Sequence, residues 1–326
     1  MSKPYIYITR KLPEEVIAPL FEIADVGMWE KEEDPVPRDI LKKEASRATA
    51  LYTMLTEDID KELFDLAENL KVVANLAVGY DNIDIDYATK KGVYVCNTPD
   101  VLSDTTADLV FALLMATARR VTEGAEYIKQ GKWKHWSPLL MVGHDIHHKT
   151  IGIVGMGRIG EKVALRATGF EMDILYHNRR RNIEVEEGIG ASFTSFDELL
   201  STSDFIVCMA PLTSETENMF DNRAFQLMKS SAIFINAARG GVVNEEALFS
   251  ALKNKEIAGA GLDVFKDEPI SADHPLLAFK NVLALPHIGS ATIETRYKMM
   301  ELVTRNILNV LKGDSPETIV NDELLN

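Results

Sequence analysis

Cysteine is scarce in this chain, which has two in 326 residues. Cys96 and Cys208 each lie in or at the end of an apolar, strand-like run, without the spacing of metal ligands. We therefore expect two buried thiols in a reducing compartment rather than a disulfide. The stretch GHDIHHK contains His144, His147 and His148, but no carboxylate accompanies them at ligand spacing, so we predict no metal site.

Long apolar runs are also missing. No stretch approaches the roughly 20 apolar residues that span a bilayer. The opening segment MSKPYIYITR lacks the apolar core of a secretory signal. We therefore expect a cytoplasmic protein with no membrane partner.

Positive charge is in short supply. The 35 Lys and Arg residues are outnumbered by 50 Asp and Glu, which gives a formal net charge of −15. Nucleic acids and anionic membranes are held by clustered Lys and Arg, so this balance argues against both as general partners.

What the chain does have is a regular alternation of strand-like and helix-like segments. One series runs from YIYIT at 5–9 to VYVCN, and a second from IGIVG at 151–155 to NVLALP. Such alternation predicts parallel strand–helix–strand units with helices on both faces of each sheet. We therefore predict an α/β fold with two doubly wound parallel-sheet domains.

The segment between the two series, DTTADLVFALLMATARRVTEGAEYIKQGKW, is typical of one long, largely apolar helix that ties domains or subunits together. The first helix, EEVIAPLFEIA, is expected to be interrupted by Pro19. A final helix from about Ala291 to Lys312 is long enough to return to the first series. The predicted division is therefore discontinuous: residues 1–102 with 290–326 form one domain, and residues 103–289 are inserted into it.

The second series opens with GMGRIG, where Gly155, Gly157 and Gly160 form a G-x-G-x-x-G pattern at a predicted strand-to-helix turn. Glycines there permit a tight turn, close approach of a pyrophosphate and close helix packing. The helix start at Arg158 and Ile159 presents backbone amides that favour an anion. The alternative is a tight turn that binds no ligand, but the context favours a dinucleotide.

Three consecutive arginines follow the next predicted strand, in LYHNRRRN. An Asp or Glu about 20 residues beyond the glycines normally binds the ribose 2′-hydroxyl of NAD. Here no carboxylate occurs before Glu184. Guanidinium groups match phosphate oxygens, so we predict that Arg179 and Arg180 bind the 2′-phosphate of NADP, with Asn178 as a neutral donor beside them. NADP(H) is then the preferred cofactor and NAD(H) the alternative. A solvated basic loop is the competing interpretation.

Polar residues also follow three later strands. They are Arg239 in INAARGG, Asp263 and Glu268 in GLDVFKDEP, and His287 in ALPHIGSAT. Ligands of open α/β sheets bind beyond the carboxyl ends of the strands, so we expect these side chains to converge on the nicotinamide end of the cofactor. Taken singly, each has a structural alternative: a surface arginine, a turn glutamate and a packed loop histidine.

The chain resembles the D-isomer-specific 2-hydroxyacid dehydrogenase family over essentially its whole length. The matching stretches are LAVGYDNID, TTADLVFALLMATARR, VGMGRIG, INAARGG, GLDVFKDEP and LPHIGSAT. Within the family, WSP around Trp136, the arginine-rich strand end and SATIETR are most similar to the glyoxylate/hydroxypyruvate reductase and 2-ketogluconate reductase branch. The resemblance implies two Rossmann/flavodoxin-like domains, the cofactor domain inserted into the substrate domain, and a homodimer in which Trp133 and Trp136 contact the partner. From the sequence alone, core packing is the alternative for these two tryptophans.

The resemblance also implies a reaction, the NADPH-dependent reduction of small 2-oxo acids such as glyoxylate, hydroxypyruvate or 2-ketogluconate to D-2-hydroxy acids. Arg239 would bind the carboxylate and carbonyl oxygen, and His287, hydrogen-bonded to Glu268, would be the general acid. Further cofactor contacts are implied for Thr106, Pro211, Thr216, Ala237, Asp263 and Gly289. Substrate contacts are implied for Val78, Gly79, Ser290, Arg296, Met54 and Leu55.

A dinucleotide-sensing binding protein on the same scaffold is the alternative function, because some members of this family are corepressors. Such a protein would not need Arg239, Glu268 and His287 together, although some corepressors retain them. Turnover distinguishes the two functions, since fold alone does not determine activity.

Overall fold

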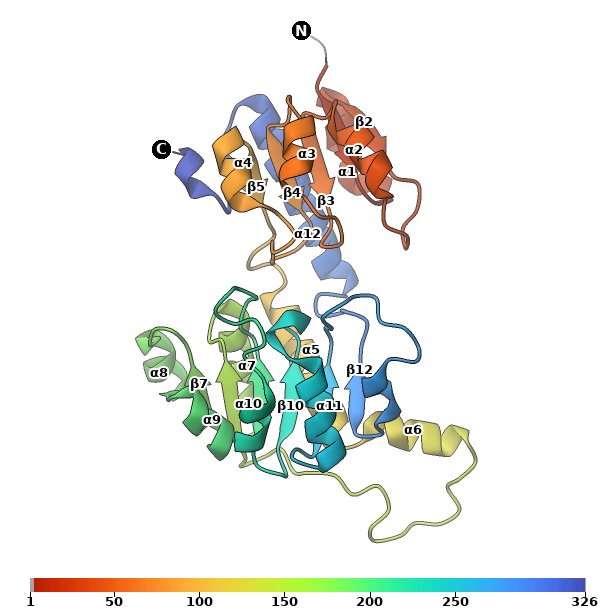
Figure 1. Cartoon of the computed structure of the whole chain (residues 1–326), viewed down its shortest axis with the longest axis vertical. Coiled ribbons are helices and arrows are strands. Elements are labelled where there is room, and N and C mark those ends of the chain that lie inside the picture. Colours follow the sequence, from red (N-terminus) through yellow and green to blue (C-terminus); the bar gives the residue numbers. More distant parts are fainter. Residues whose placement is uncertain (1–2, 326) are drawn as a thin grey trace. The chain divides into compact units, whose positions relative to one another are not determined.

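The computed structural model describes residues 3–325 and divides into two compact units (Figure 1). The first unit contains the residues up to Leu102 together with those from Thr292 onward, and the second is Ser103–Ala291. Each unit has its own parallel sheet covered by helices, so the predicted α/β fold class is confirmed.

The sheet of the first unit has five strands in the order β2-β1-β3-β4-β5. The strands are β1 (Tyr5–Ile8), β2 (Asp25–Met28), β3 (Ala50–Thr53), β4 (Val72–Asn75) and β5 (Tyr94–Cys96). Every residue of β3 and β4 is buried, as expected where helices cover both faces of a parallel sheet. All neighbouring strands run parallel, so their carboxyl ends share one edge.

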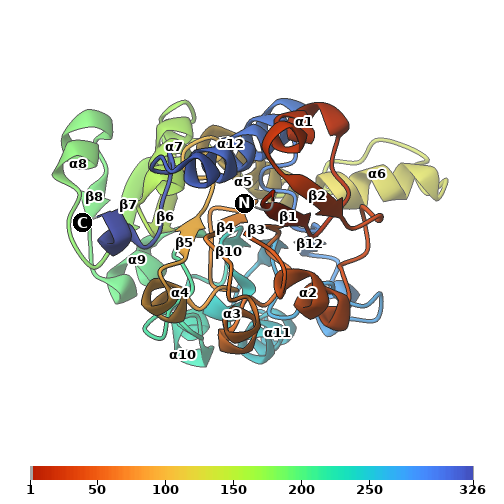
Figure 2. The ribbon, with the colours of Figure 1, turned by 90° about the horizontal axis from the view of Figure 1, so that it is seen from above.

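Two helices cover one face of this sheet and three cover the other (Figure 2). The pair is α1 (Glu14–Ile23) and α12 (Ile293–Lys312), and the opposite face carries α2 (Arg38–Ala45), α3 (Lys61–Leu66) and α4 (Ile85–Lys91). The predicted interruption at Pro19 is wrong, because α1 continues through it. Val16, Ile17 and Leu20 are buried beneath the helix, and their packing outweighs the backbone hydrogen bond that proline cannot donate.

The sheet of the second unit has seven strands in the order β12-β11-β10-β9-β6-β7-β8. The strands are β6 (Thr150–Val154), β7 (Asp173–His177), β8 (Ser192–Phe193), β9 (Phe205–Cys208), β10 (Ile233–Asn236), β11 (Gly259–Leu262) and β12 (Val282–Ala284). The strand order reverses at β6, which lies between β7 and β9. Parallel sheets bind ligands in the crevice beyond the carboxyl ends at such a switch point.

Helices cover both faces of the second sheet as well. α5 (Ser103–Ala118) and α7 (Arg158–Thr168) pack together on one face, and α9 (Phe196–Thr202), α10 (Asn222–Leu227) and α11 (Glu245–Asn254) lie on the other (Figure 2). The remaining helical segments are α6 (Val121–Lys129), α8 (Ile183–Ile189) and the short 3-10 turns η1 (Gly240–Val242), η2 (Pro275–Ala278) and η3 (Asp322–Leu325). α5 also packs against β10 and β11, which explains its many buried apolar residues.

The single long helix predicted after Ser103 is wrong, because the structure has two helices with a break at Arg119 and Arg120. Arg120 takes a left-handed backbone with φ 54°. The amide of His144 donates to the Ala118 carbonyl at 2.9 Å, so the last carbonyl of α5 is hydrogen-bonded by a later segment. As a result, α6 and the loop after it extend away from the body of the second unit (Figure 1).

Both cysteines are buried at the ends of strands, Cys96 in β5 and Cys208 in β9. Burial raises the pKa of each thiol to about 12, so neither is a reactive thiolate at neutral pH. Among the residues described, no helix has both the length and the apolar character needed to cross a membrane.

Candidate active site

The glycine turn joins β6 to α7 and depends on glycine at two positions. Gly155 has φ +104°, and a Cβ there would lie 2.5 Å from the Met209 carbonyl carbon. A Cβ at Gly160 would lie 2.3 Å from the Gly155 oxygen, so the helix packs directly on the turn. A Cβ added to Gly157, the residue that caps the N-terminus of α7, would meet no atom within 4 Å. The middle of the turn is therefore open to a ligand at the helix N-terminus.

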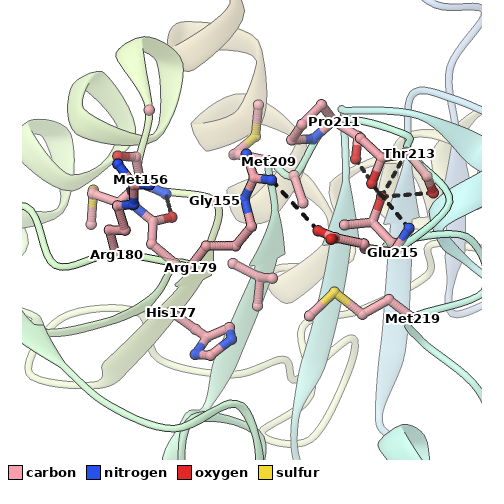
Figure 3. Close-up of a pocket in the computed structure, with 15 residues that line it drawn as sticks. Gly155, Met156, His177, Arg179, Arg180, Met209, Pro211, Thr213, Glu215 and Met219 are labelled. Carbon is pink, nitrogen blue, oxygen red and sulfur yellow. Dashed lines mark hydrogen bonds and ion pairs between the residues drawn. The ribbon is translucent and has the colours of Figure 1, made fainter. Parts of the chain in front are cut away.

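A cavity of about 630 Å³ lies beside this turn, at the carboxyl ends of β6, β7 and β9 (Figure 3). Its volume is within the range of small-molecule sites. The walls are formed by the turn at 154–157, the strand end at 177–180, and residues of the loop at 209–216 together with Met219. The predicted cofactor contacts Pro211 and Thr216 therefore share one cavity with the glycine turn and the arginines.

The three consecutive arginines differ in their surroundings. Arg179 and Arg180 line the cavity, and the Arg179 Nη1 lies 3.5 Å from the carboxylate of Glu215 on the opposite wall. Arg181 instead pairs with Glu186. The hydrogen bonds from Arg181 and Tyr176 lower the pKa of Glu186 to about 2. Two of the three guanidinium groups are thus placed to meet an anion in the cavity.

Asn178 connects the arginine-bearing strand end to the glycine turn. Its Oδ1 accepts from the Met156 amide at 2.7 Å, and its Nδ2 donates to the Met156 carbonyl at 3.2 Å. Thr216 has a similar role in its own loop, because its hydroxyl accepts from the Thr213 amide at 2.8 Å and donates to the Pro211 carbonyl at 2.6 Å. Both side chains shape the walls of the cavity, a role that the sequence did not indicate.

Arg239, Glu268 and His287 follow β10, β11 and β12, which are neighbours in the sheet. The Nδ1 of His287 lies 2.7 Å from Glu268 Oε2, and the other carboxylate oxygen accepts from the Phe265 amide at 2.8 Å. Burial alone would raise the pKa of Glu268. The hydrogen bond and charge of His287, the Phe265 amide and the charge of Arg239 outweigh burial and lower that pKa. Glu268 is therefore a carboxylate that orients the imidazole.

Asp263 holds the backbone of His287 in an unusual conformation. His287 has φ 53°, a left-handed backbone that is costly for any residue with a Cβ. The Asp263 carbonyl accepts from the His287 amide at 2.9 Å, and its Oδ1 accepts from the Ile288 amide at 2.8 Å. Two hydrogen bonds from one buried residue thus keep the histidine loop in place.

The second oxygen of Asp263 identifies a place for a ligand. Burial raises the pKa of this carboxyl against the opposing effect of the Ile288 and Gly289 amides and the charge of His287, and within residues 3–325 no donor meets Oδ2 with the geometry of a full hydrogen bond. A Cβ at Gly289 would lie 3.3 Å from this oxygen and 3.3 Å from Thr106 Cγ2, so the three predicted contacts meet. A buried acceptor without a donor is unfavourable, and a bound group with an N–H would satisfy it.

The turn that carries Ala237 and Arg239 is fixed by Asn236, which the sequence reasoning missed. Asn236 is 1% exposed, its Nδ2 donates to the Arg239 carbonyl at 3.0 Å, and its Oδ1 accepts from the Ala238 amide at 3.1 Å. A Cβ at Gly240 would lie 1.8 Å from the Phe265 carbonyl carbon, so this turn touches the loop of Glu268. The position of Asn236, a polar residue at the end of an apolar strand, is the sequence feature that could have identified this role.

In the first unit, Val78 and Gly79 lie in the turn after β4. Asn97 donates to the Val78 carbonyl at 2.8 Å, and Asn75 donates to the Gly79 carbonyl at 3.0 Å. Neither amide of this turn donates a hydrogen bond within the described part of the chain. The two carbonyls are therefore tied down, while two adjacent N–H groups remain for an anion such as a carboxylate.

Met54 and Leu55 follow β3, and the conformation of their loop depends on Glu57. No sequence pattern indicated this role of Glu57. Glu57 Oε2 accepts from the Met54 amide at 2.7 Å and from the Thr9 hydroxyl at 2.7 Å. Arg10 lies 3.3 Å from the other oxygen, and the two side chains are 11% and 2% exposed. This buried ion pair fixes the loop at the carboxyl edge of the first sheet.

Replacing Glu57 with alanine is expected to lower the free energy of unfolding of the first unit by about 3 kcal/mol, because it removes the carboxylate beside the buried Arg10 and leaves the Met54 amide without its acceptor. Thermal or urea unfolding followed by circular dichroism measures the effect. The neighbouring Asp58 is exposed, and Asp58→Ala is the matched control. Equal stability of the two variants would contradict the prediction.

The remaining predicted residues are spread over both units. Ser290 precedes α12 within the second unit, and Arg296 lies in α12 within the first.

Nowhere in residues 3–325 do three His, Cys, Asp or Glu side chains gather as metal ligands would, and His148 lies 3.2 Å from Glu171. Trp133 and Trp136 are 56% and 79% exposed in the loop after α6.

The lowered pKa of Glu268 predicts a pH-dependent contribution to stability. The folded carboxyl titrates below its ordinary value of 4.5, so its contribution is present above that pH and is lost as the pH falls through the lowered pKa. The melting temperatures of the parent and Glu268→Gln should therefore differ most above pH 4.5 and converge in acid. Asp267→Asn, an exposed neighbour, is the control. A difference that is constant with pH would refute the proposed coupling.

Comparison with known proteins identifies the class. Residues 111–289 match the family described as D-isomer specific 2-hydroxyacid dehydrogenase, NAD binding domain. The glyoxylate reductase of Thermococcus onnurineus (strain NA1) is 51% identical over 328 residues, covering 99% of this chain and 98% of that protein. The fold and these matches define an oxidoreductase with an NAD(P)-binding domain. The chain belongs to the D-isomer specific 2-hydroxyacid dehydrogenase family, so the resemblance predicted from its motifs is confirmed.

Solved structures agree with this assignment. A protein from Thermus thermophilus superposes with a TM-score of 0.91 at 41% identity, covering 97% of this chain and 99% of that one. The NADPH-dependent glyoxylate/hydroxypyruvate reductase of Sinorhizobium meliloti, solved in complex with NADP and malonate, has a TM-score of 0.84 at 31% identity. That alignment covers 98% of this chain and 97% of the other.

Proposed function

We propose that this protein reduces glyoxylate, and related small 2-oxo acids such as hydroxypyruvate and 2-ketogluconate, to D-2-hydroxy acids with NADPH. The observation that carries the proposal is the 2.7 Å pair of His287 and Glu268 beside the Arg239 turn. A binding protein would not require a histidine oriented by a carboxylate. The Thermococcus relative bears the name glyoxylate reductase, and the Sinorhizobium neighbour is named for glyoxylate and hydroxypyruvate.

The residues of the chain have distinct parts in this reaction. The reduced nicotinamide, when bound, supplies a hydride. Arg239 holds the carboxylate and carbonyl oxygen of the substrate and stabilises the negative charge that develops there. His287 donates a proton to that oxygen from Nε2, because Glu268 engages Nδ1. The unpartnered Asp263 Oδ2 accepts from the carboxamide, beside Thr106 and Gly289.

The other contacts divide between dinucleotide and substrate. The glycine turn and the first amides of α7, at Arg158 and Ile159, bind the pyrophosphate. Arg179 and Arg180 bind the 2′-phosphate. The amides of Val78 and Gly79 bind the substrate carboxylate, with Met54 and Leu55 beside the small substrate. Ser290 and Arg296 bind the hydroxylated tail of a longer one.

Initial rates of nicotinamide oxidation test this function directly, with NADPH and NADH each against glyoxylate, hydroxypyruvate and 2-ketogluconate. We expect the highest kcat/KM with NADPH and glyoxylate, and a selective loss of NADPH use in Arg180→Gln. Equal or better rates with NADH would contradict the NADPH preference while leaving the reduction intact. Tight dinucleotide binding without turnover of any oxo acid would favour the corepressor-like function instead.

We also propose a homodimer held by α6 and the loop after it. Ile128, Trp133, Trp136 and Leu139 are each more than half exposed in this extended segment, which is unfavourable for large apolar side chains in water. A second copy of the chain would cover them. Sedimentation should give twice the monomer mass for the parent and the monomer mass for Trp136→Glu. A monomeric parent would contradict the dimer.

A further inference from the structure

One ion pair spans the dinucleotide cavity from wall to wall. Arg179 comes from the chain after β7, and Glu215 from the loop after β9 (Figure 3). The Nη1 of Arg179 lies 3.5 Å from the Glu215 carboxylate, and both residues line the cavity. The guanidinium placed to bind a 2′-phosphate therefore already has an anionic partner.

The loop that carries Glu215 is held by its own hydrogen bonds. The Thr216 hydroxyl bridges the Thr213 amide and the Pro211 carbonyl, and the Glu215 amide donates to the Thr213 hydroxyl at 3.3 Å. These bonds fix the backbone of the turn from which the carboxylate extends. Glu215 therefore remains at the cavity when Arg179 moves.

We propose that Glu215 is a specificity-determining residue that limits the preference for NADPH over NADH. Its carboxylate competes with the 2′-phosphate for Arg179, and it offers an acceptor to the 2′-hydroxyl of NADH. This proposal rests on the proposed function, in which Arg179 and Arg180 bind the phosphate.

The absence of an acid after β7 supports this assignment. A dinucleotide fold of this kind normally has an Asp or Glu at that strand end to accept from the ribose hydroxyl. Here the strand end has Asn178, whose amide is bonded to Met156, and then the arginines. Glu215 brings a carboxylate to the same cavity from a different loop, at a distance in sequence that no local pattern would indicate.

The charges and the exposure of the ion pair determine that Glu215 disfavours NADPH rather than NADH. Arg179 and Glu215 are 86% and 68% exposed, and exposed ion pairs contribute little, so a phosphate displaces the carboxylate easily. The displaced carboxylate then lies near a phosphate with almost two negative charges and repels it. NADH has no such phosphate and leaves the pair intact. The penalty therefore falls on NADPH alone.

The test is Glu215→Gln, which keeps the size of the side chain and removes its charge. The ratio of kcat/KM for NADPH to that for NADH, at saturating glyoxylate, should rise about tenfold at low salt. The gain should shrink in about 0.5 M salt, where exposed charges are screened within a few ångströms. Glu217→Gln is the matched control, because Glu217 is exposed in the same loop and makes no part of the cavity wall.

Calorimetric binding of NADP⁺ and NAD⁺ to the same variants separates this proposal from the proposed function, because it does not require turnover. If Arg179→Gln weakens NADP⁺ selectively but Glu215→Gln leaves the ratio of the two Kd values unchanged, the role of Glu215 is wrong and the phosphate site stands. If neither variant affects the ratio, the role of Glu215 and the assignment of Arg179 to the 2′-phosphate both fail, while the reduction of oxo acids is tested separately by turnover. Equal effects of Glu215→Gln on the two dinucleotides would also overturn the inference, since they would indicate only a loop-stabilising role.

The double variant Arg179→Gln/Glu215→Gln tests the competition itself. If Glu215 acts mainly by occupying Arg179, its removal should give a much smaller gain when that arginine is absent. A tenfold gain that persists without Arg179 would assign the effect to direct repulsion between Glu215 and the phosphate, and would overturn competition for this arginine.

Discussion

Replacing His287 with alanine is expected to lower kcat for glyoxylate reduction by about 10²–10⁴-fold, the usual contribution of a positioned general acid. The dissociation constant for NADPH should change little, because the imidazole is bonded to Glu268 and is assigned to the substrate oxygen. Steady-state kinetics at saturating NADPH, together with calorimetric titration of the dinucleotide, measure the two effects.

A matched control exists in the same unit. His148, in the loop before β6 rather than beside Arg239, also has a left-handed backbone, with φ 57°, and lies 3.2 Å from a glutamate, Glu171. His148→Ala should retain kcat within about twofold if only the placement of His287 matters. Adding Glu268→Gln to His287→Ala should cause little further loss, because the two residues act as one unit. A His287→Ala enzyme with near-parental kcat would remove this histidine from the mechanism.

Replacing Arg239 with glutamine is expected to lower kcat/KM for glyoxylate by about 10²–10³-fold, as is typical when one electrostatic donor to a developing oxyanion is removed. Lysine should restore only part of the activity, since its ammonium lacks the planar fork that binds a carboxylate with two hydrogen bonds. Titrating glyoxylate at saturating NADPH separates the KM and kcat components.

Arg223 provides the control for this substitution. It is an exposed arginine on α10 paired with Asp197 on α9, so Arg223→Gln makes the same change of charge away from Glu268 and His287. Near-normal kinetics are expected there. If Arg239→Gln were as active as Arg223→Gln, the substrate carboxylate would have to be held by another group.

Much of the fold could be predicted from local sequence patterns. Apolar runs bounded by turn residues located the major strands, and the glycine turn with its packing constraints at Gly155 and Gly160 followed from a motif with a clear steric basis. The adjacency of Arg239, Glu268 and His287 followed from a general rule, because parallel strands present their carboxyl ends along one edge.

What could not be predicted depends on contacts between distant segments. The helix break at Arg120 follows from a hydrogen bond between His144 and Ala118, and α1 runs through Pro19 because its apolar face is buried. The bonds of Asn178 to Met156 and the pairing of Glu215 with Arg179 join residues that are 22 and 36 positions apart. Neither contact leaves a periodic or spaced pattern in the sequence.

The interleaved arrangement of the units has a consequence for biosynthesis. Chains generally fold from the N-terminus as they leave the ribosome, yet the helical cover of the first sheet is completed only by α12 and the segment after it. Tyr52 donates to the Met300 carbonyl at 3.1 Å, and Asn321 accepts from the Val95 amide at 2.9 Å, so β3 and β5 acquire these partners last. The second unit can close while the first still exposes its sheet. A nascent chain arrested after Ala291 should therefore resist protease in its second unit and be cleaved in its first.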